Sequence, residues 1–240
     1  MFCVFKMKKM VGAFLLSLGI LLITVAMVIN LGTEEIEVFN ADSEPTYTIV
    51  IDAGHGEPDG GAVSKNGIAE AGLNLEIASR LEKELDKLGY HIIMTRTTEN
   101  NIADSDKQTP VRTMKVSDIN NRIKIVNESQ ADMLISIHMN NFQNPKYYGW
   151  QTFYKKNSEE SKVIAENIQT GISNNINRVN DRVALAITDI KLVDKSTIPA
   201  VIVECGFLSN EEDLRLLMTD EYKQQIVAGI VEGIEKCYAN

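Results

Sequence analysis

Three short runs of almost wholly apolar residues constrain the fold of this 240-residue chain more than any other feature. They are YTIVI (47–51), MLISI (133–137) and AVIVE (200–204). A strand without polar alternation is covered on both faces, as in a parallel sheet flanked by helices. Segments with helical apolar spacing, such as 70–88 and 163–176, separate these runs. The pattern predicts an α/β fold with a mainly parallel sheet.

The remaining segments complete this predicted layout. YHIIMT (90–95) and GWQTFY (149–154) have the composition of two further strands. The polar stretch 96–116 is predicted to be a long surface loop, followed by a helix that Ser117 or Asp118 caps. A mixed region precedes the last strand, and two helices close the chain.

The first 31 residues differ in character from the rest. Three lysines precede 11–29, a segment without charged side chains that is long enough to cross a bilayer as a helix. We therefore expect a cytoplasmic tail and membrane anchor or signal at 1–31, an acidic tether at 32–45 and one extracytoplasmic domain at 46–240. The length of the apolar run favours an anchor over a cleaved signal, which stays the alternative.

Charge and cysteine usage exclude some partners and bonds. All 33 acidic residues but only 21 of the 24 basic residues lie beyond residue 31. This acidic balance argues against a nucleic-acid partner. Cys205 falls in a strand pattern and Cys237 in a terminal helix pattern, so both are interpreted as buried small residues rather than as a disulfide.

Polar side chains stand at the carboxyl ends of the three apolar runs. His138 directly follows the second run, and Glu204 is the last residue of the third. His55 follows the first run, in the glycine-rich loop GHGEPDGG (54–61). In open α/β sheets the ligand crevice lies at this edge. Two imidazoles and a carboxylate are the ligand set of a catalytic zinc ion, and Glu204 could transfer protons. The predicted chemistry is amide hydrolysis by water activated on zinc, without a covalent enzyme intermediate.

Other candidates compete with this interpretation. Glu70 begins a helix near the same edge, where the pattern fits a metal ligand and a dipole-stabilising acid equally well. His91 opens a strand at the opposite end of the sheet and is interpreted as an ordinary polar residue. Cys205 could act as a nucleophile with a histidine base, but its alternation with Glu204 points it to the opposite face.

Taken together, these segments resemble the zinc-dependent N-acetylmuramoyl-L-alanine amidases of bacterial cell-wall metabolism, over about residues 47–238. The resemblance rests on several motifs in the family's order. They are IDAGHGEPDGGAV (51–63), GIAEAGLNLEIASRL (67–81), MTR (94–96), NNRIKIVNESQADMLISIHMNN (120–141) and PAVIVECGFLSN (199–210).

The resemblance implies His55, Glu70 and His138 as zinc ligands and Glu204 as the catalytic acid-base residue. It implies a twisted, mainly parallel six-stranded sheet with helices on both faces, and hydrolysis of the amide between N-acetylmuramic acid and L-alanine in peptidoglycan. The wording is most similar to the germination-specific amidases of spore formers (CwlD type), which implies removal of stem peptides from spore cortex, as the first step of muramic lactam formation, in the forespore or spore envelope.

Two departures from the family pattern concern substrate contacts. Glu57 and Pro58 stand where the family more often has glycine, and the family's Arg-Gly-Val run appears as DRVALAITDIKLVDK (181–195). The groove walls are expected at 96–116 and at 140–148, although the aromatic side chains of the latter segment could equally be packing residues.

Alternatives in function also stay open. The chain could be a catalytically weak amidase-like module that binds or regulates cell-wall machinery, although such a module has no need of Glu204. A zinc carboxypeptidase or deacetylase on a similar sheet is a third hypothesis. An activating protein partner is a further possibility that the sequence leaves undecided.

Overall fold

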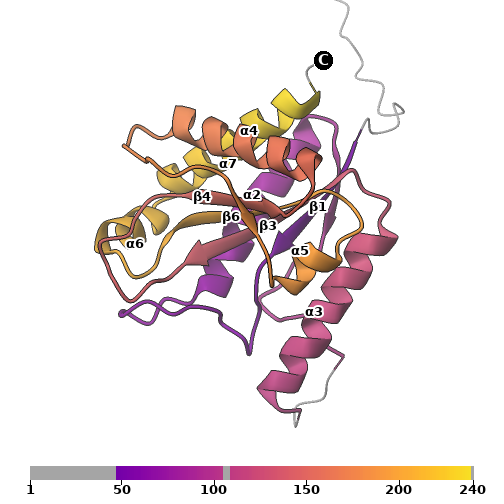
Figure 1. Cartoon of the computed structure of the whole chain (residues 1–240). Helices are drawn as coiled ribbons and strands as arrows, with labels where there is room; N and C mark the ends of the chain where they lie inside the picture. The colour runs from indigo at the N-terminus through magenta and orange to yellow at the C-terminus, as the bar shows by residue number, and fades with distance from the viewer. Residues whose placement is uncertain (1–46, 105–108, 239–240) are drawn as a thin grey trace, which may run out of the picture. The chain divides into compact units, whose positions relative to one another are not determined.

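A computed structural model describes residues 47–104 and 109–238 of the protein. They form one six-stranded sheet in the order β2-β1-β3-β6-β4-β5, with helices on both faces (Figure 1). The strands are β1 (Thr48–Ala53), β2 (His91–Met94), β3 (Met133–Asn140), β4 (Gln151–Lys155), β5 (Leu185–Ile187) and β6 (Ala200–Phe207). The helices are α2 (Glu70–Lys87), α3 (Val111–Glu128), α4 (Glu159–Asn175), α5 (Lys191–Lys195), α6 (Glu211–Leu217) and α7 (Asp220–Tyr238).

The sheet is mixed in direction. Strands β2, β1, β3 and β6 run parallel, whereas β4 is antiparallel to β6 and β5 runs parallel to β4. The predicted α/β class, the six strands and the helices on both faces are therefore confirmed, and the mainly parallel sheet carries two reversed strands at one edge.

The predicted membrane segment at 11–29 and the tether at 32–45 lie outside the described residues. Within 47–104 and 109–238, no helix is both long enough and apolar enough to cross a membrane.

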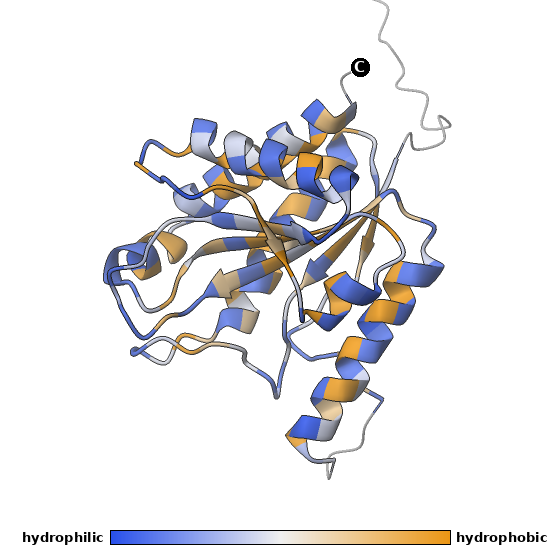
Figure 2. Cartoon of the chain, viewed as in Figure 1, coloured by the Kyte–Doolittle hydropathy of each residue, from blue (hydrophilic) through white to orange (hydrophobic). Residues whose placement is uncertain are grey.

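Helices cover both faces of the central strands, which explains the unbroken apolar runs. On one face α2, α4 and α7 pack against residues such as Ile51, Ile135 and Val203. On the other face α3 and α5 cover Val50 and Leu134. Figure 2 shows hydrophobic stretches in the central strands and alternating hydrophobic and hydrophilic residues along the helices that flank them. Alternate residues of one strand therefore enter different core clusters, and both faces select apolar side chains.

The structure corrects three predicted boundaries. Helix α3 begins at Val111, directly after Pro110, within the stretch predicted to be a surface loop. Its first two turns are mostly exposed, so they carry no apolar stripe that a sequence pattern could detect. The region 178–198, left without assignment, contains β5 and α5. Strands β3 and β6 also continue past the predicted ends, so that His138 and Glu204 lie within strands.

Helices α4 and α7 approach each other closely at glycines. A Cβ atom added to Gly229 would lie 2.3 Å from the Cα atom of Ile172, and one added to Gly171 would lie 2.2 Å from the carbonyl oxygen of Gly229. Real Cβ atoms do not come this close to backbone, so these positions admit no side chain without separation of the helices.

We predict that Gly229→Ala lowers the free energy of unfolding by about 1–3 kcal/mol, because the methyl group overpacks a backbone contact. Gly72→Ala is the matched control, since a Cβ atom at this helical position meets nothing within 4 Å. The control should raise the free energy of unfolding by roughly 0.5–1 kcal/mol through helix propensity. Urea unfolding measures both, and equal effects would contradict the packing argument.

Candidate active site

The loop after β1 brings His55 close to the carboxyl end of β3 and to the start of α2. His55 has a left-handed backbone with φ of 61°. A Cβ atom at Gly54 would lie 2.3 Å from the ring of His138, and one at Gly61 would lie 2.6 Å from Oε2 of Glu70. Glycine is therefore required at both positions for the loop to pass this close to the two side chains.

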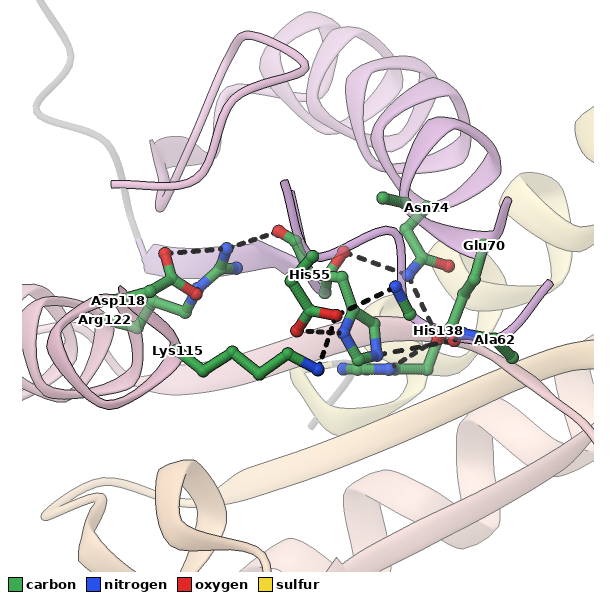
Figure 3. A network of polar contacts seen from close by, with 12 residues as sticks. His55, Ala62, Glu70, Asn74, Lys115, Asp118, Arg122 and His138 are labelled. Atoms are coloured by element: carbon green, nitrogen blue, oxygen red, sulfur yellow. Dashed lines mark hydrogen bonds and ion pairs between the residues drawn. The ribbon is translucent and has the colours of Figure 1, made fainter. Parts of the chain in front are cut away.

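His55, Glu70 and His138 meet at the carboxyl edge of the sheet, as Figure 3 shows. Glu70 Oε1 lies 2.8 Å from His138 Nδ1, and Glu70 Oε2 lies 3.4 Å from His55 Nε2. One donor atom from each residue can be chosen so that all three lie within 4.8 Å of one another. Two imidazole nitrogens and a carboxylate oxygen suit a zinc ion that keeps a position open for substrate or water, so the donor set fits this metal.

Backbone and side-chain donors fix the carboxylate of Glu70. Its Oε2 accepts from the backbone N–H of Ala62 at 2.8 Å, and its Oε1 accepts from the backbone N–H of Met139 at 3.1 Å and from Asn74 Nδ2 at 3.2 Å. Burial alone would raise the pKa of Glu70, but hydrogen bonds and charge from His138 and His55 hold that pKa far below its usual range. Glu70 is therefore ionised and rigidly oriented.

Asp59 contacts the ring nitrogen of His55 that does not face Glu70, and Lys115 in turn contacts Asp59. His55 Nδ1 lies 3.1 Å from Asp59 Oδ2, and the other oxygen of Asp59 lies 2.7 Å from Lys115 Nζ on α3. Burial alone would lower the pKa of His55, but contacts with Glu70 and Asp59 raise it to about 9. The carboxylates of Glu70 and Asp59 therefore stabilise a positive charge at the imidazole of His55. Either a proton or a bound cation can carry this charge. With Nδ1 held by Asp59, Nε2 faces Glu70.

Glu204 stands beside this cluster on the neighbouring strand. It is the register partner of His138 in the parallel pair β3–β6. Its Oε2 is buried and has no hydrogen-bond partner among the described residues. Burial raises the pKa of Glu204 to about 7, and the nearby charge of Glu70 acts in the same direction. A carboxyl group with such a pKa can both accept and release a proton near neutral pH.

The competing cysteine and histidine candidates lie away from this cluster. Cys205 is fully buried in the core on the opposite face of β6, where its thiol donates to the carbonyl of Val203 and burial raises the pKa of that thiol. Cys205 and Cys237 are both free thiols, so no disulfide joins them. His91 is exposed at the start of β2, at the other end of the sheet. The structure thus excludes Cys205 as a nucleophile for this site.

A cavity of about 160 Å³ opens beside the two histidines, on the face that α3 and α5 cover. Lys115 is the one lining residue from the predicted groove segment 96–116. The second predicted groove segment supplies Phe142 and Tyr147, which are half exposed and pack on Phe207. The aromatic side chains of this segment therefore pack on the domain with one side and stay exposed to solvent on the other.

The model of the family described as N-acetylmuramoyl-L-alanine amidase matches residues 49–236, which include the whole cluster. The chain belongs to the N-acetylmuramoyl-L-alanine amidase family. The expected enzyme class, an amidase that acts on peptidoglycan, is thereby confirmed.

Relatives of this amidase include a germination-specific amidase and two amidases of known structure. The germination-specific N-acetylmuramoyl-L-alanine amidase of Bacillus subtilis is 35% identical over 78% of this chain and 77% of its own length. The CwlD amidase from Clostridioides difficile, whose structure is known in complex with the GerS lipoprotein, has 36% sequence identity to this chain. The two structures superpose with a TM-score of 0.78 over 80% of this chain and 98% of that one. An N-acetylmuramoyl-L-alanine amidase from Clostridium difficile 630 is 28% identical, with a TM-score of 0.71 over 82% and 98% of the two chains.

A buried ion pair anchors the amidase's first site loop. Arg122 of α3 lies 2.6 Å from Asp52 Oδ1, and both side chains are almost fully buried. Asp52 also accepts hydrogen bonds from Thr95 at 2.7 Å and Ser136 at 2.6 Å. Burial alone would raise the pKa of Asp52, but Arg122 and these donors lower it to about 2. Sequence patterns gave no role to this pair, because a buried arginine on a helix resembles any other basic residue.

The lowered pKa of Asp52 predicts a pH-dependent contribution to stability. The folded pKa of about 2 lies below the ordinary value of 3.8, so the ionised carboxylate stabilises the protein above about pH 4 and ceases to do so as the pH falls toward 2. At neutral pH, Asp52→Asn should lower the free energy of unfolding by about 3 kcal/mol, because the buried Arg122 loses one of its two carboxylate partners.

The measurement is urea unfolding of wild type and Asp52→Asn at several pH values. The difference between their free energies of unfolding should shrink steadily below about pH 4. Asp86→Asn, at an exposed position on α2, is the control and should differ little from wild type throughout. A wild-type advantage that stays constant down to about pH 2.5 would contradict the argument.

Proposed function

We propose that this amidase cleaves the amide between N-acetylmuramic acid and L-alanine with Zn²⁺ held by His55, Glu70 and His138, and with Glu204 as the acid-base residue. The observation that carries the proposal is the unpartnered buried oxygen of Glu204 beside a cluster of three donor groups. A buried polar atom without a partner is costly, and a functional role explains why it is kept.

The residues of the site divide the reaction between them. When bound, Zn²⁺ would polarise the scissile carbonyl and lower the pKa of a water molecule. Glu204, on the strand next to His138, accepts the proton that the attacking water loses and then donates it to the nitrogen of L-alanine, which leaves as an amine. Glu70 and His55 stay fixed through their hydrogen bonds, so the reacting groups need no rearrangement.

The biological setting is the second part of the proposal. Similarity to the germination-specific amidase of Bacillus subtilis supports removal of stem peptides from spore cortex, as the first step toward muramic lactam. The domain would act outside the cytoplasm, in the forespore or spore envelope, with residues 1–31 as a membrane anchor or signal. The complex of the Clostridioides difficile CwlD amidase with the GerS lipoprotein supports a protein partner for this chain as well.

The competing hypothesis is a catalytically weak module that binds cell-wall material. The three donor groups of His55, Glu70 and His138 lie close together with the carboxyl group of Glu204 beside them, which supports an enzyme over a binding module that requires no such group. The third hypothesis, a zinc carboxypeptidase or deacetylase, differs in the products that it releases, so one digest of peptidoglycan separates all three.

We predict that Glu204→Gln lowers the turnover number at least about 100-fold while Zn²⁺ stays bound, because the amide keeps the shape but cannot transfer the proton. The measurement is mass analysis of peptidoglycan digests together with metal content. His138→Ala is the contrasting variant and should lose the metal. Release of single D-amino acids or acetate, instead of stem peptides with a free L-alanine amine, would contradict the proposed bond.

A separate prediction concerns the carboxylate behind His55. Asp59→Asn should weaken Zn²⁺ binding about 10- to 100-fold, because outer carboxylates orient zinc-bound imidazoles and raise their basicity. Competition with a chelator measures the affinity, and Asp86→Asn on the outer surface of α2 serves as the control. Unchanged affinity in Asp59→Asn would show that the contact between His55 and Asp59 has no such role.

A further inference from the structure

The guanidinium group of Arg182 is held in a fixed position next to the candidate site. It lies over the ring of Phe207, 4.6 Å from the centroid, and 5.8 Å from the centroid of Tyr147. Its Nε donates to the carbonyl of Tyr148 and its Nη1 donates to Gln151 Oε1, both at 2.8 Å. These contacts orient a planar cation that the mechanism above does not use.

Among the residues that the structure describes, no carboxylate neutralises this cation. Arg178, four residues earlier, pairs with the buried Asp213, and Arg215 pairs with Glu212. Within 47–104 and 109–238, Arg182 lies within ion-pair distance of no acidic side chain, and the acceptors of its hydrogen bonds are neutral. In a chain with 33 acidic and 24 basic residues, an oriented and uncompensated arginine points to an anionic ligand.

Strand pairing places Arg182 close to Glu204. Gln151, which binds the guanidinium, is the register partner of Glu204 in the antiparallel pair β4–β6. Directly opposite residues of an antiparallel pair project to the same face, with Cβ atoms roughly 5 Å apart. His138, Glu204, Gln151 and Arg182 therefore follow one another across the edge of the sheet.

The surface around Arg182 suits a carboxylate on a flexible chain. A hollow of about 230 Å³ lies beside it, lined by Lys146, Tyr147, Tyr148, Asn180, Asp181 and Arg182, so cations outnumber anions there. The forked guanidinium matches a carboxylate in two hydrogen bonds better than any other side chain does. The half-exposed ring of Tyr147 adds an apolar wall.

We propose that Arg182 determines specificity by binding a carboxylate of the stem peptide, two or three residues from the amide that is cut. Neighbouring strands lie about 4.8 Å apart, so Arg182, beyond β4, lies on the order of 10 Å from Glu204. An extended peptide covers roughly 3.4 Å per residue, which gives the stated separation. The inference rests on the proposed function, because it takes the scissile amide to lie at Glu204.

The test compares the full chain loaded with Zn²⁺ on three soluble muramoyl tripeptides. One carries free carboxylates on its second and third residues, and each of the others has one of these carboxylates converted to an amide. Arg182→Gln should lower kcat/KM on the free acid about 10- to 100-fold, as expected for loss of a charged hydrogen-bonded pair. In the wild type, one of the two amidated substrates should show the same loss, and Arg182→Gln should add little to it.

Two further variants separate recognition from folding. Arg182→Lys keeps the charge but not the fork, so its loss on the free acid should be intermediate. Arg80→Gln removes an arginine of α2 that pairs with Glu76 on the same helix and with Asp220 on α7, away from the site, and its kcat/KM values should match those of the wild type. Thermal unfolding of each variant checks that the fold is retained.

The outcomes distinguish this inference from the proposed function. A wild-type enzyme that cleaves all three substrates equally well would overturn the role of Arg182, whatever the variants do. An equal loss in Arg182→Gln on all three substrates would also overturn it, because that result indicates a purely structural residue. A zinc-loaded wild type that releases no stem peptide from any substrate would instead overturn the proposed function.

Discussion

The buried guanidinium of Arg122 is the interaction on which the site depends. It binds Asp52 at the end of β1, the carbonyl of Ala53 at 2.8 Å and the carbonyl of His55, while Asp118 on the same helix accepts from its other side. Burial of an isolated cation would be prohibitive, but two carboxylates and two carbonyls offset that cost. The same hydrogen bonds fix α3 against the sheet and hold the left-handed backbone at His55.

A second buried arginine completes this support. Arg96, which follows β2, donates to the carbonyl groups of Ala53, Gly54 and Ala71 at 2.8–3.0 Å. Asn74 on α2 donates to the same Gly54 carbonyl at 3.0 Å. A buried carbonyl group needs a hydrogen-bond donor, and these side chains supply donors where β1 ends and α2 begins. Arg96 and Asn74 thus join the loop of His55 to the start of the helix that carries Glu70, while Arg122 joins the same loop to α3.

The sequence predicted the parts of the site that depend on strand burial. Apolar runs mark central strands, and parallel strands end at one edge, so His55, His138 and Glu204 could be placed together without coordinates. The sequence did not predict a role for Asp59 and Lys115, because their contact depends on how the loop folds back and on where α3 begins. That helix start lacks an apolar stripe, and an aspartate four residues after His55 was the one available signal.

The reversal of β4 decides what lies on the far side of Glu204. In a fully parallel sheet the carboxyl end of β4 would lie at the sheet edge where His55, Glu70 and His138 meet. Here β4 is reversed, so its first residue, Gln151, pairs with Glu204. The turn before β4 fits closely against the segment that carries Arg182, since Asn180 Nδ2 donates to the carbonyl of Trp150 at 2.8 Å. Gly149, with φ of 86°, has no room for a side chain beside Asn180. A single change of strand direction therefore brings Arg182, from a loop without regular structure, to the side of Glu204 opposite His138.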